Sequence, residues 1–460
     1  MEQMMINQLL KKQQDFFKSG KTLSVDFRIA SLKKLREAIL LYEKDIKDAL
    51  YKDLGKSDYE SYMCEIGIAL KEISYLIKNT KKFAAKQKIK TSLFLFPAKT
   101  YTQACPYGNT LIMSPWNYPF LLTIEPLADS IAAGNTTILK PSAYSAATTN
   151  VIKKIVEYAF PEEYVAVVSG GRKENADLLK QKFNFIFFTG SQTVGKEVLR
   201  NASDNLIPVI LELGGKSPCI VDETANIPLT AKRIIFGKML NCGQTCIAPD
   251  FVFCEKSIKN QLVKALCKEI ENQFGKNVFK NADYGHIIND KHFERILSLI
   301  DSEKVVCGNI VEKESLKISP TIMDNVTWED KIMQEEIFGP VLPILTYEKL
   351  EDAILKIKEK PKPLALYIFS NNKHNIETVT NNTLFGCGAI NDTILQISNT
   401  ELAFGGVGES GMGAYHGKVG FEAFSHKKGI LKQKNWLDLS MRYQPYKKKS
   451  FEKLLHFFLK

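Results

Sequence analysis

The chain has 460 residues, 45% of them hydrophobic and 25% charged, which is typical of globular proteins and long enough for two or three domains. The net charge is +11, but no basic run is interleaved with aromatic residues in the body of the chain, so we expect no nucleic-acid binding. No apolar stretch is long enough for a membrane span, and the first residues lack the apolar core of a signal peptide.

The N-terminal part is predicted to be helical. Apolar residues recur there at spacings of three and four, at Leu32, Leu35, Ile39, Tyr42 and Ile46. The sequence LGKSD at 54–58 interrupts this pattern, and a second helical run continues to about Lys86. Residues 91–108 alternate loosely and contain prolines, which predicts an irregular edge ribbon.

From Asn109 onward, apolar strands alternate with amphipathic helices. The predicted strands of a first set are 110–114, 136–140, 164–170, 183–190 and 208–215, and its helices are 121–133, 146–159, 174–181 and 193–202. A second set has strands at 218–222, 250–255, 339–347 and 363–371, with helices near 229–240, 257–273, 291–301 and 349–359. Continuous apolar strands separated by helices predict parallel sheets covered on both faces.

Two polar residues stand at the ends of predicted buried strands, where open parallel sheets bind ligands. Lys140 ends the strand TTILK and either holds a ribose or phosphate or is simply solvated. Glu212 ends PVILELGG, and its carboxylate is either paired in a salt bridge or partly desolvated, which would make it a better base near neutral pH.

Two turns could also bind a ligand. Gly190 and Ser191 lie between a strand and a helix that contains Gly195 in its first turn, so helix N–H groups could bind a phosphate. The spacing is not the usual dinucleotide pattern, and a plain strand–turn–helix joint explains it equally well. In SPWNYP, prolines hold Asn117 as either a structural turn or a donor to an oxyanion.

The stretch LNCGQTCIAPD contains Cys242 and Cys246, and it could be a redox pair, half of a metal site or one nucleophile with a bystander. A cysteine on a Gly-rich loop can ionise and attack a carbonyl. No histidine has a zinc-like spacing to this stretch, so we expect no metal, while a Cys–His hydrolase is not excluded by spacing. The chain has nine scattered cysteines, an odd number that fits a reducing, cytoplasmic location.

These motifs, in this order, resemble those of the aldehyde dehydrogenases. The matching stretches are SPWNYP, LKPS, FTGSQTVGKEV, LELGGKSP, GQTCIAPD, EEIFGPVLPI and FGGVGESGMGAYHG. The likeness runs from about Asp53 to the last residues. It is greatest for the class 3 branch, which acts on fatty and aromatic aldehydes and whose terminal pattern AYHGKxxFxxFSH is present here as AYHGKVGFEAFSH.

The resemblance implies an α/β fold with a Rossmann-like cofactor domain, an α/β catalytic domain and a β-ribbon that bridges subunits of a homodimer. We expect the cofactor domain at 1–90 and 108–213 and the catalytic domain at 214–393. The oligomerisation element would comprise 91–107 and 394–435, followed by a C-terminal tail at 436–460.

The resemblance also implies the chemistry. Cys246 would attack an aldehyde, and the Asn117 side chain with the Cys246 N–H would stabilise the oxyanion. The resulting thiohemiacetal would pass hydride to NAD or NADP and leave a thioester, which Glu212 would hydrolyse by activating water. The cofactor would be held by six residues, namely Lys140, Gly190, Ser191, Gly195, Glu336 and Phe338.

Several residues depart from the family pattern. Gln396 and Ala403 stand where His and Pro are usual, which we expect to reshape the substrate entrance. Cys242 replaces a small residue and is either a buried bystander or a thiol that forms a reversible disulfide with Cys246. The basic and then apolar tail is too short to span a membrane, and we expect it to pack on the entrance or the partner subunit rather than to make weak peripheral membrane contact.

Other functions fit parts of the sequence. A CoA-acylating dehydrogenase or a thioester hydrolase would also use Cys246, but a water-activating Glu212 is redundant when CoA accepts the acyl group. A non-catalytic binding or structural protein on the same scaffold would have no need of Cys246, Glu212 and Asn117 together. We therefore expect NAD(P)-dependent oxidation of medium- or long-chain aliphatic or aromatic aldehydes.

Ala143 generates a prediction about the cofactor. Relatives that use NAD often carry Glu three residues after the ribose lysine, where a carboxylate repels a 2′-phosphate. With Ala143 at this position, we expect NADP to be used at least as readily as in those relatives. Steady-state kinetics with both cofactors checks this, and a kcat/KM for NAD that is a hundredfold higher, ~3 kcal/mol, would contradict it.

Overall fold

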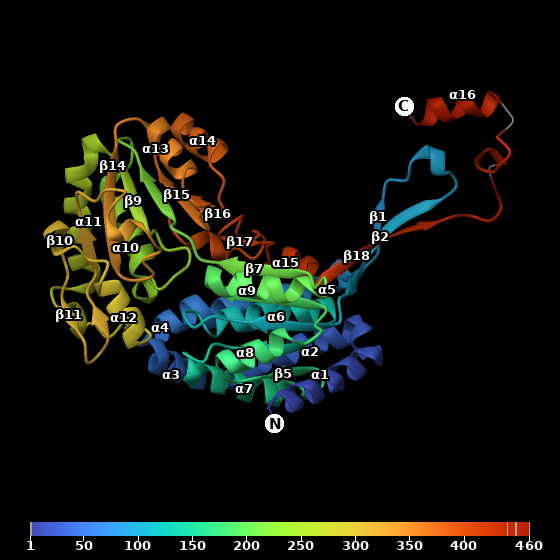
Figure 1. The fold of residues 1–460 in the computed structure, drawn as a ribbon, viewed down its shortest axis with the longest axis horizontal. Coiled ribbons are helices and arrows are strands. Elements are labelled where there is room, and N and C mark those ends of the chain that lie inside the picture. Colours follow the sequence, from blue (N-terminus) through green and yellow to red (C-terminus); the bar gives the residue numbers. More distant parts are fainter. Residues whose placement is uncertain (1, 439, 447–448, 460) are drawn as a thin grey trace.

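A computed structural model describes residues 2–438, 440–446 and 449–459, which form two α/β units and a projecting arm (Figure 1). A six-stranded and a seven-stranded sheet form the centres of the two units. The arm consists of a three-stranded ribbon and the end of the chain, and it extends away from both units. The predicted α/β class with an added β-ribbon is therefore confirmed.

The six-stranded sheet has the order β17-β7-β6-β3-β4-β5. Its strands are β3 (Asn109–Met113), β4 (Thr136–Lys140), β5 (Val165–Val167), β6 (Phe185–Gly190), β7 (Val209–Leu213) and β17 (Gly411–Met412). The five strands β3 to β7 are parallel, and their apolar side chains are almost all buried. β17 lies in the range predicted for oligomerisation, yet it pairs antiparallel with β7, where Gly411 faces Glu212.

Helices cover this sheet, and the first five of them come from the N-terminal part of the chain. They are α1 (Glu2–Lys18), α2 (Val25–Leu41), α3 (Glu43–Leu54), α4 (Asp58–Ser61), α5 (Gly67–Ala84), α6 (Leu121–Ala133), α7 (Ala146–Ala159), α8 (Arg172–Leu179) and α9 (Gln192–Ser203). The apolar positions that predicted one helix belong to two, because the chain breaks at Tyr42 between α2 and α3. Between α4 and α5, residues Tyr62–Ile66 form a turn of π-helix, a feature common at functional sites.

The seven-stranded sheet has the order β10-β13-β14-β9-β8-β15-β16 and is parallel except for β10. Its strands are β8 (Pro218–Val221), β9 (Phe251–Glu255), β10 (Val305–Cys307), β13 (Thr321–Met323), β14 (Val341–Tyr347), β15 (Ala365–Phe369) and β16 (Cys387–Ile390), and a small hairpin adds β11 (Val311–Glu312) and β12 (Lys317–Ile318). Its helices are α10 (Ile227–Met239), α11 (Lys259–Phe274), α12 (Asp290–Leu297), α13 (Leu350–Lys358) and α14 (Lys373–Asn382).

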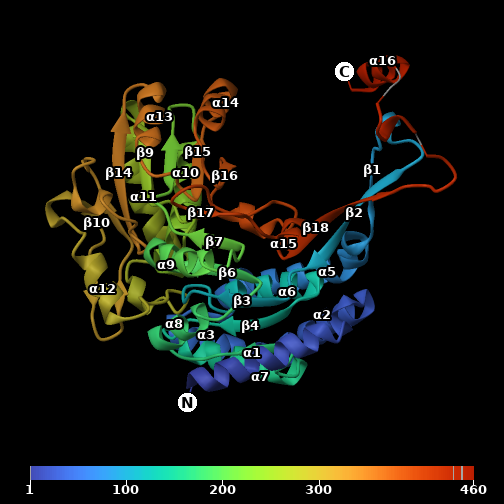
Figure 2. The same ribbon diagram turned by 45° about the vertical axis from the view of Figure 1, so that its right-hand side comes forward.

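The arm is the antiparallel sheet β1-β2-β18, made of β1 (Gln87–Ile89), β2 (Lys99–Pro106) and β18 (Ser425–Lys432). Helix α15 (Gly417–Ala423) precedes β18 and packs on α5 and α6. The last helix, α16 (Lys449–Phe458), lies beside the tip of the ribbon, where the rings of Phe94 and Phe458 are 6.1 Å apart (Figure 2).

The predicted tail at 436–460 is only partly visible in this arrangement, because residues 439, 447–448 and 460 lie outside the described part of the chain. Within the described part, no helix combines the length and the apolar character that crossing a bilayer requires.

Candidate active site

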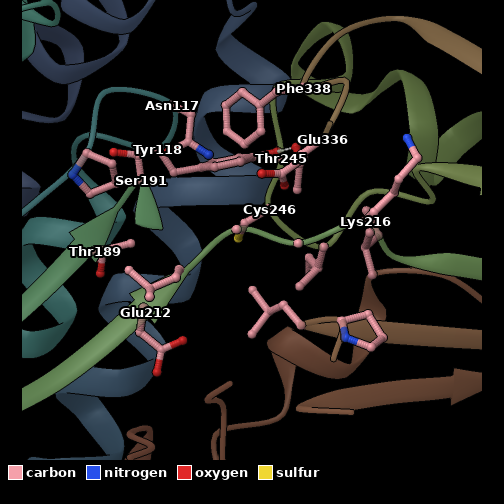
Figure 3. Close-up of a pocket in the computed structure, with 18 of the residues that line it drawn as sticks. Asn117, Tyr118, Thr189, Ser191, Glu212, Lys216, Thr245, Cys246, Glu336 and Phe338 are labelled. Atoms are coloured by element: carbon pink, nitrogen blue, oxygen red, sulfur yellow. Dashed lines mark hydrogen bonds between the residues drawn. The ribbon is translucent and has the colours of Figure 1, made fainter. Parts of the chain in front are cut away.

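A cavity of about 810 Å³ lies between the two α/β units. Seven of the nine predicted site residues line it: Asn117, Gly190, Ser191, Glu212, Cys246, Glu336 and Phe338. All of these except Gly190 are labelled in Figure 3. They come from strand ends and loops of both units, at positions up to 221 residues apart in the chain, between 117 and 338. Lys140 and Gly195 do not line this cavity.

The Cys246 loop follows a turn of unusual backbone geometry, in the 3-10 helix Leu240–Gly243 at the end of α10. Asn241, Cys242 and Gly243 all have positive φ angles, 52°, 53° and 74°. Two consecutive non-glycine residues in this region are strained and persist only where neighbours enforce them. Gly243 must be glycine, since a Cβ there would overlap the carbonyl of Gly339.

Hydrogen bonds from several elements fix the conformation of this loop. The Gln244 amide donates to the carbonyls of Asn241 (3.1 Å) and His286 (3.0 Å), and its oxygen accepts from the N–H of Ile288 at 3.0 Å. Glu60 accepts from the Asn241 N–H at 2.9 Å, and burial raises the pKa of Glu60 to about 7. The loop is therefore fixed before substrate arrives.

Cys246 itself is partly exposed, and it faces the cavity. Desolvation, then Glu336 and Glu212, raise the pKa of its thiol far above the usual value. The thiol must therefore lose its proton in an unfavourable setting before it can attack a carbonyl.

A buried ion pair holds Asn117 against this loop. Lys56 and Glu65 are 1% and 0% exposed, and the Lys56 Nζ lies 2.5 Å from Glu65 and 2.9 Å from the Asn117 carbonyl oxygen. The Asn117 carbonyl also accepts from the Asn241 amide at 2.7 Å, and the Asn117 amide donates to the Gln244 carbonyl at 3.0 Å. Figure 3 shows this amide directed toward the side of the cavity that carries Cys246.

Glu65 also ties the pair to α6. Its second oxygen accepts the N–H groups of Phe120 (2.8 Å) and Leu121 (3.1 Å), which places a carboxylate at the positive end of that helix. The π-helical turn that contains Glu65 thus connects α5, α6 and the Asn117 loop through one side chain.

Glu212 is the least satisfied polar group of the site. Within the described residues neither of its carboxyl oxygens has a hydrogen-bond partner, although the side chain is buried. Desolvation raises the pKa of Glu212 well above its usual value, so burial disfavours its charged form. The predicted strand-end carboxylate is therefore not in a salt bridge, and in Figure 3 it is turned away from the Cys246 sulfur.

Glu336 and Phe338 enter the cavity from the loop before β14. A Cβ on Gly214 would overlap the Glu336 carboxylate, so the Gly-Gly pair after Glu212 makes room for this side chain. Burial raises the pKa of Glu336 to about 8, although a hydrogen bond from the N–H of Gly215 stabilises the charged form and so lowers this pKa. Phe338 has a positive φ of 49°, and its ring packs on Trp116 at 5.3 Å.

At the predicted phosphate turn, Ser191 caps α9 by accepting the N–H of Val194 at 3.4 Å. The remaining first-turn N–H groups of α9 adjoin the cavity through Ser191 and Gln192, which fits an anionic group. Gly195 lets α9 pack closely on β7, because a Cβ at this position would lie only 2.7 Å from the Leu213 side chain.

Lys140 ends β4 as predicted, outside the cavity. Its Nζ donates to the carbonyls of Gly170 (2.7 Å) and Pro141 (2.9 Å), and burial lowers its pKa to about 8. Glu174, at the start of α8, is the carboxylate that acts most on this pKa, in the raising direction.

Sequence reasoning missed four residues that build the site: Lys56, Glu65, Gln244 and Glu174. Lys56 and Glu65 lie in the stretch DLGKSDYESYMCEIG, which was matched to the family without assigned roles. Their spacing of nine residues carries no signal for an ion pair, since neither helix period places them together. Gln244 was visible only as a neighbour of Cys246.

The unusual residues near the site have plain structural roles. Cys242 is 3% exposed and packs among Phe251, Phe253 and Tyr284, which favours the buried bystander. Gln396 does not line the cavity, and it donates to the Tyr367 hydroxyl at 3.0 Å. That hydroxyl donates in turn to the carbonyl of Ile247, beside Cys246, at 2.6 Å. Ala403 is exposed, outside the cavity.

Among the described residues, no group of three or more His, Cys, Asp or Glu side chains is arranged to hold a metal ion. The nine cysteines are all free.

Comparisons with known proteins agree on one family. The model of the "Aldehyde dehydrogenase family" matches residues 1–430. The chain is 47% identical to 4,4'-diaponeurosporen-aldehyde dehydrogenase of Staphylococcus aureus, over 94% of this chain and 95% of the relative. It is 41% identical to "Aldehyde dehydrogenase, dimeric NADP-preferring" of Canis lupus familiaris, over 96% and 98%. The solved "Substrate bound state of Staphylococcus Aureus AldH" superposes with a TM-score of 0.97 at 46% identity, over 98% and 99% of the two chains.

The buried ion pair gives a test of how the site is held. We expect Lys56→Met to lower the free energy of unfolding by about 3–5 kcal/mol, because it leaves the Glu65 charge buried and unpaired. We expect it also to slow any reaction at Cys246, because the Asn117 carbonyl loses a donor. Denaturant unfolding and the rate of Cys246 alkylation measure the two effects.

A matched control removes an exposed ion pair instead. Lys256 and Glu348 are 67% and 74% exposed and 2.7 Å apart, so Lys256→Met is expected to change stability by less than about 1 kcal/mol. Equal effects of the two substitutions would contradict the role assigned to Lys56.

Proposed function

The chain belongs to the aldehyde dehydrogenase family and oxidises aldehydes to carboxylic acids with NAD or NADP, and on that premise we propose that Cys246, Asn117 and Glu212 carry the reaction. The observation that supports this assignment is the shared cavity, into which all three side chains are brought from separate elements. A fixed cysteine loop, a restrained amide and an unpartnered carboxyl are what acyl transfer through sulfur requires.

In the proposed first step, the Cys246 sulfur forms a bond to the aldehyde carbon after losing its proton. The carbonyl oxygen becomes an oxyanion, which accepts hydrogen bonds from the Asn117 amide and the Cys246 N–H. Asn117 is preorganised for this, because its carbonyl is held by Lys56 and Asn241. Bound nicotinamide supplies the oxidation, by accepting hydride from the substrate carbon.

In the proposed second step, the resulting thioester on Cys246 is hydrolysed. Glu212 takes a proton from a water molecule as the water oxygen bonds to the acyl carbon, and the C–S bond then breaks to release the acid and the thiolate. A buried carboxyl without a protein partner has both oxygens free to bind that water. The same feature argues against CoA as the acyl acceptor, which needs no such base.

We propose that Glu336 and Phe338 hold the nicotinamide ribose, and that Gly190, Ser191 and the start of α9 hold the pyrophosphate. The room left by Gly214 for the Glu336 carboxylate and the uncapped N–H groups of α9 support this arrangement. We also propose that Lys140 binds the adenosine ribose, and that Gly195 positions the turn at Gly190 and Ser191 by letting α9 pack on β7.

The cavity also bears on the substrate. Apolar side chains form much of its wall, among them Met63, Ile68, Leu121, Leu122, Phe236 and Phe404. Burial of an acyl chain there contributes roughly 0.8 kcal/mol per methylene group, which favours medium- or long-chain aliphatic and aromatic aldehydes. The S. aureus relative, named for diaponeurosporen-aldehyde, is consistent with a large apolar substrate.

We further propose a cytoplasmic homodimer joined through the ribbon of β1, β2 and β18, which includes parts of the predicted ranges 91–107 and 394–435. Within 394–435, β17 and α15 instead pack on the first α/β unit. Nine free cysteines suit a reducing compartment. In the described residues, β18 is hydrogen-bonded to a strand on one side only, and an open strand edge of this kind can pair with another chain. The Canis relative is named as dimeric.

Stopped-flow formation of reduced cofactor tests the catalytic assignments. Wild type should show sustained turnover with an apolar aldehyde. Glu212→Gln should retain a first burst of reduced cofactor and lose steady-state hydrolysis, because only deacylation needs the base. Cys246→Ser should lose both phases, by a factor of at least about 1,000.

Cys105→Ser is the matched control, since Cys105 lies in β2 of the ribbon and does not line the cavity. Undiminished turnover of Cys246→Ser would refute the proposed mechanism, and a burst lost together with hydrolysis in Glu212→Gln would refute the role of Glu212.

The arm yields a separate prediction. Light scattering of the full chain should give twice the mass of one chain, and a variant that ends at Tyr446 should remain dimeric, because the ribbon is intact. We expect neither protein to float with anionic vesicles, since one short amphipathic stretch binds membranes weakly. Flotation of the full chain that the truncation abolishes would instead establish peripheral membrane contact through the tail.

A further inference from the structure

The turn between β5 and α8 carries a carboxylate in a fixed position. The N–H of Gly171 donates to Glu174 Oε2 at 2.5 Å, and a Cβ on Gly170 would overlap the same carboxylate. The Glu174 side chain therefore folds back over the glycine pair instead of extending into solvent. It is only partly exposed.

Lys140 contacts the same turn. Its Nζ donates to the Gly170 carbonyl at 2.7 Å, so Lys140 and Glu174 bind to adjacent glycines of one turn, Gly170 and Gly171. Each side chain also stabilises the charge of the other: Glu174 opposes the lowering of the Lys140 pKa by burial, and Lys140 is among the groups that lower the pKa of Glu174. The carboxylate beside Lys140 is thus charged at neutral pH.

We infer that Glu174 is a specificity-determining residue that disfavours a 2′-phosphate on the adenosine ribose, and so limits the use of NADP. The inference rests on the proposed function, in which Lys140 binds that ribose. The choice between NAD and NADP would then depend on two positions from different elements, Glu174 and Ala143, whereas the sequence indicated only Ala143.

The chemistry of the two cofactors differs at this one position. A ribose 2′-hydroxyl can donate a hydrogen bond to a carboxylate, whereas a 2′-phosphate carries a charge of about −1.5 to −2 and is repelled by it. Ala143 is exposed and small, so it leaves space for a phosphate. The charge that opposes the phosphate comes instead from Glu174, 34 residues after Lys140 in the chain.

A purely structural role for Glu174 makes a different prediction. A carboxylate in the first turn of α8 also stabilises that helix, through N–H groups and the helix dipole. Loss of that role would lower stability and affect both cofactors alike. The ratio of the two cofactors therefore separates selection from helix stabilisation.

The test is Glu174→Gln, with kcat/KM measured for NADP and NAD using one aldehyde. We expect the NADP-to-NAD ratio to rise at least tenfold, which corresponds to 1.4 kcal/mol. Glu197→Gln, the same charge change on exposed α9, should leave the ratio unchanged. Ala143→Glu added to Glu174→Gln should return the ratio toward that of wild type, because it restores a carboxylate beside the ribose.

Calorimetric binding provides a readout that does not depend on turnover. In Glu174→Gln, binding of 2′-phospho-ADP-ribose should strengthen relative to binding of ADP-ribose, in parallel with the kinetic ratio. In the Ala143→Glu single variant, which leaves α8 intact, it should weaken. Normal turnover with unchanged ratios in Glu174→Gln would overturn the inference and leave the proposed function standing. A wild type that reduces neither cofactor with any aldehyde would overturn the proposed function itself.

Discussion

The geometry of the site depends on one buried ion pair. Lys56 and Glu65 lie 2.5 Å apart in the interior, and each completes its hydrogen bonding with backbone groups of the Asn117 loop or of α6. A buried ion pair is tolerated when its remaining donors and acceptors are hydrogen-bonded, whereas a single buried charge without a partner is costly. The pair therefore fixes the position of the N-terminal helices relative to the cavity wall.

Contacts of this ion pair also restrain the loop that carries Cys246. The Asn117 carbonyl accepts from both Lys56 and the Asn241 amide, and Asn241 is the first residue of the strained turn before Cys246. Strained backbone persists only where surrounding contacts over-determine it, and here Gln244 and Glu60 supply those contacts. Cys246 therefore lies on a loop whose conformation is fixed by hydrogen bonds from several elements.

Much of the fold could be predicted from the sequence, because parallel strands are continuous apolar runs and helices have their own period. Glu212 and Cys246 could also be predicted, since a carboxylate ending an apolar strand and a cysteine on a Gly-rich loop are locally unusual. The Lys56–Glu65 pair and the Glu174 turn could not, because their meaning lies in contacts between distant elements. The break at Tyr42 and the two-residue strand β17 leave too short a pattern to detect.

The electrostatics of the cavity suggest why its groups act in sequence. Burial is the main cause that raises the pKa of Glu212, of Glu336 and of the Cys246 thiol, so the charged form of each is disfavoured. Ionised Glu212 would raise the free energy of a Cys246 thiolate, since the two charges repel. In the proposed mechanism the sulfur carries no charge once it is bound in a thioester, so this repulsion is present before acylation and absent when Glu212 acts on water.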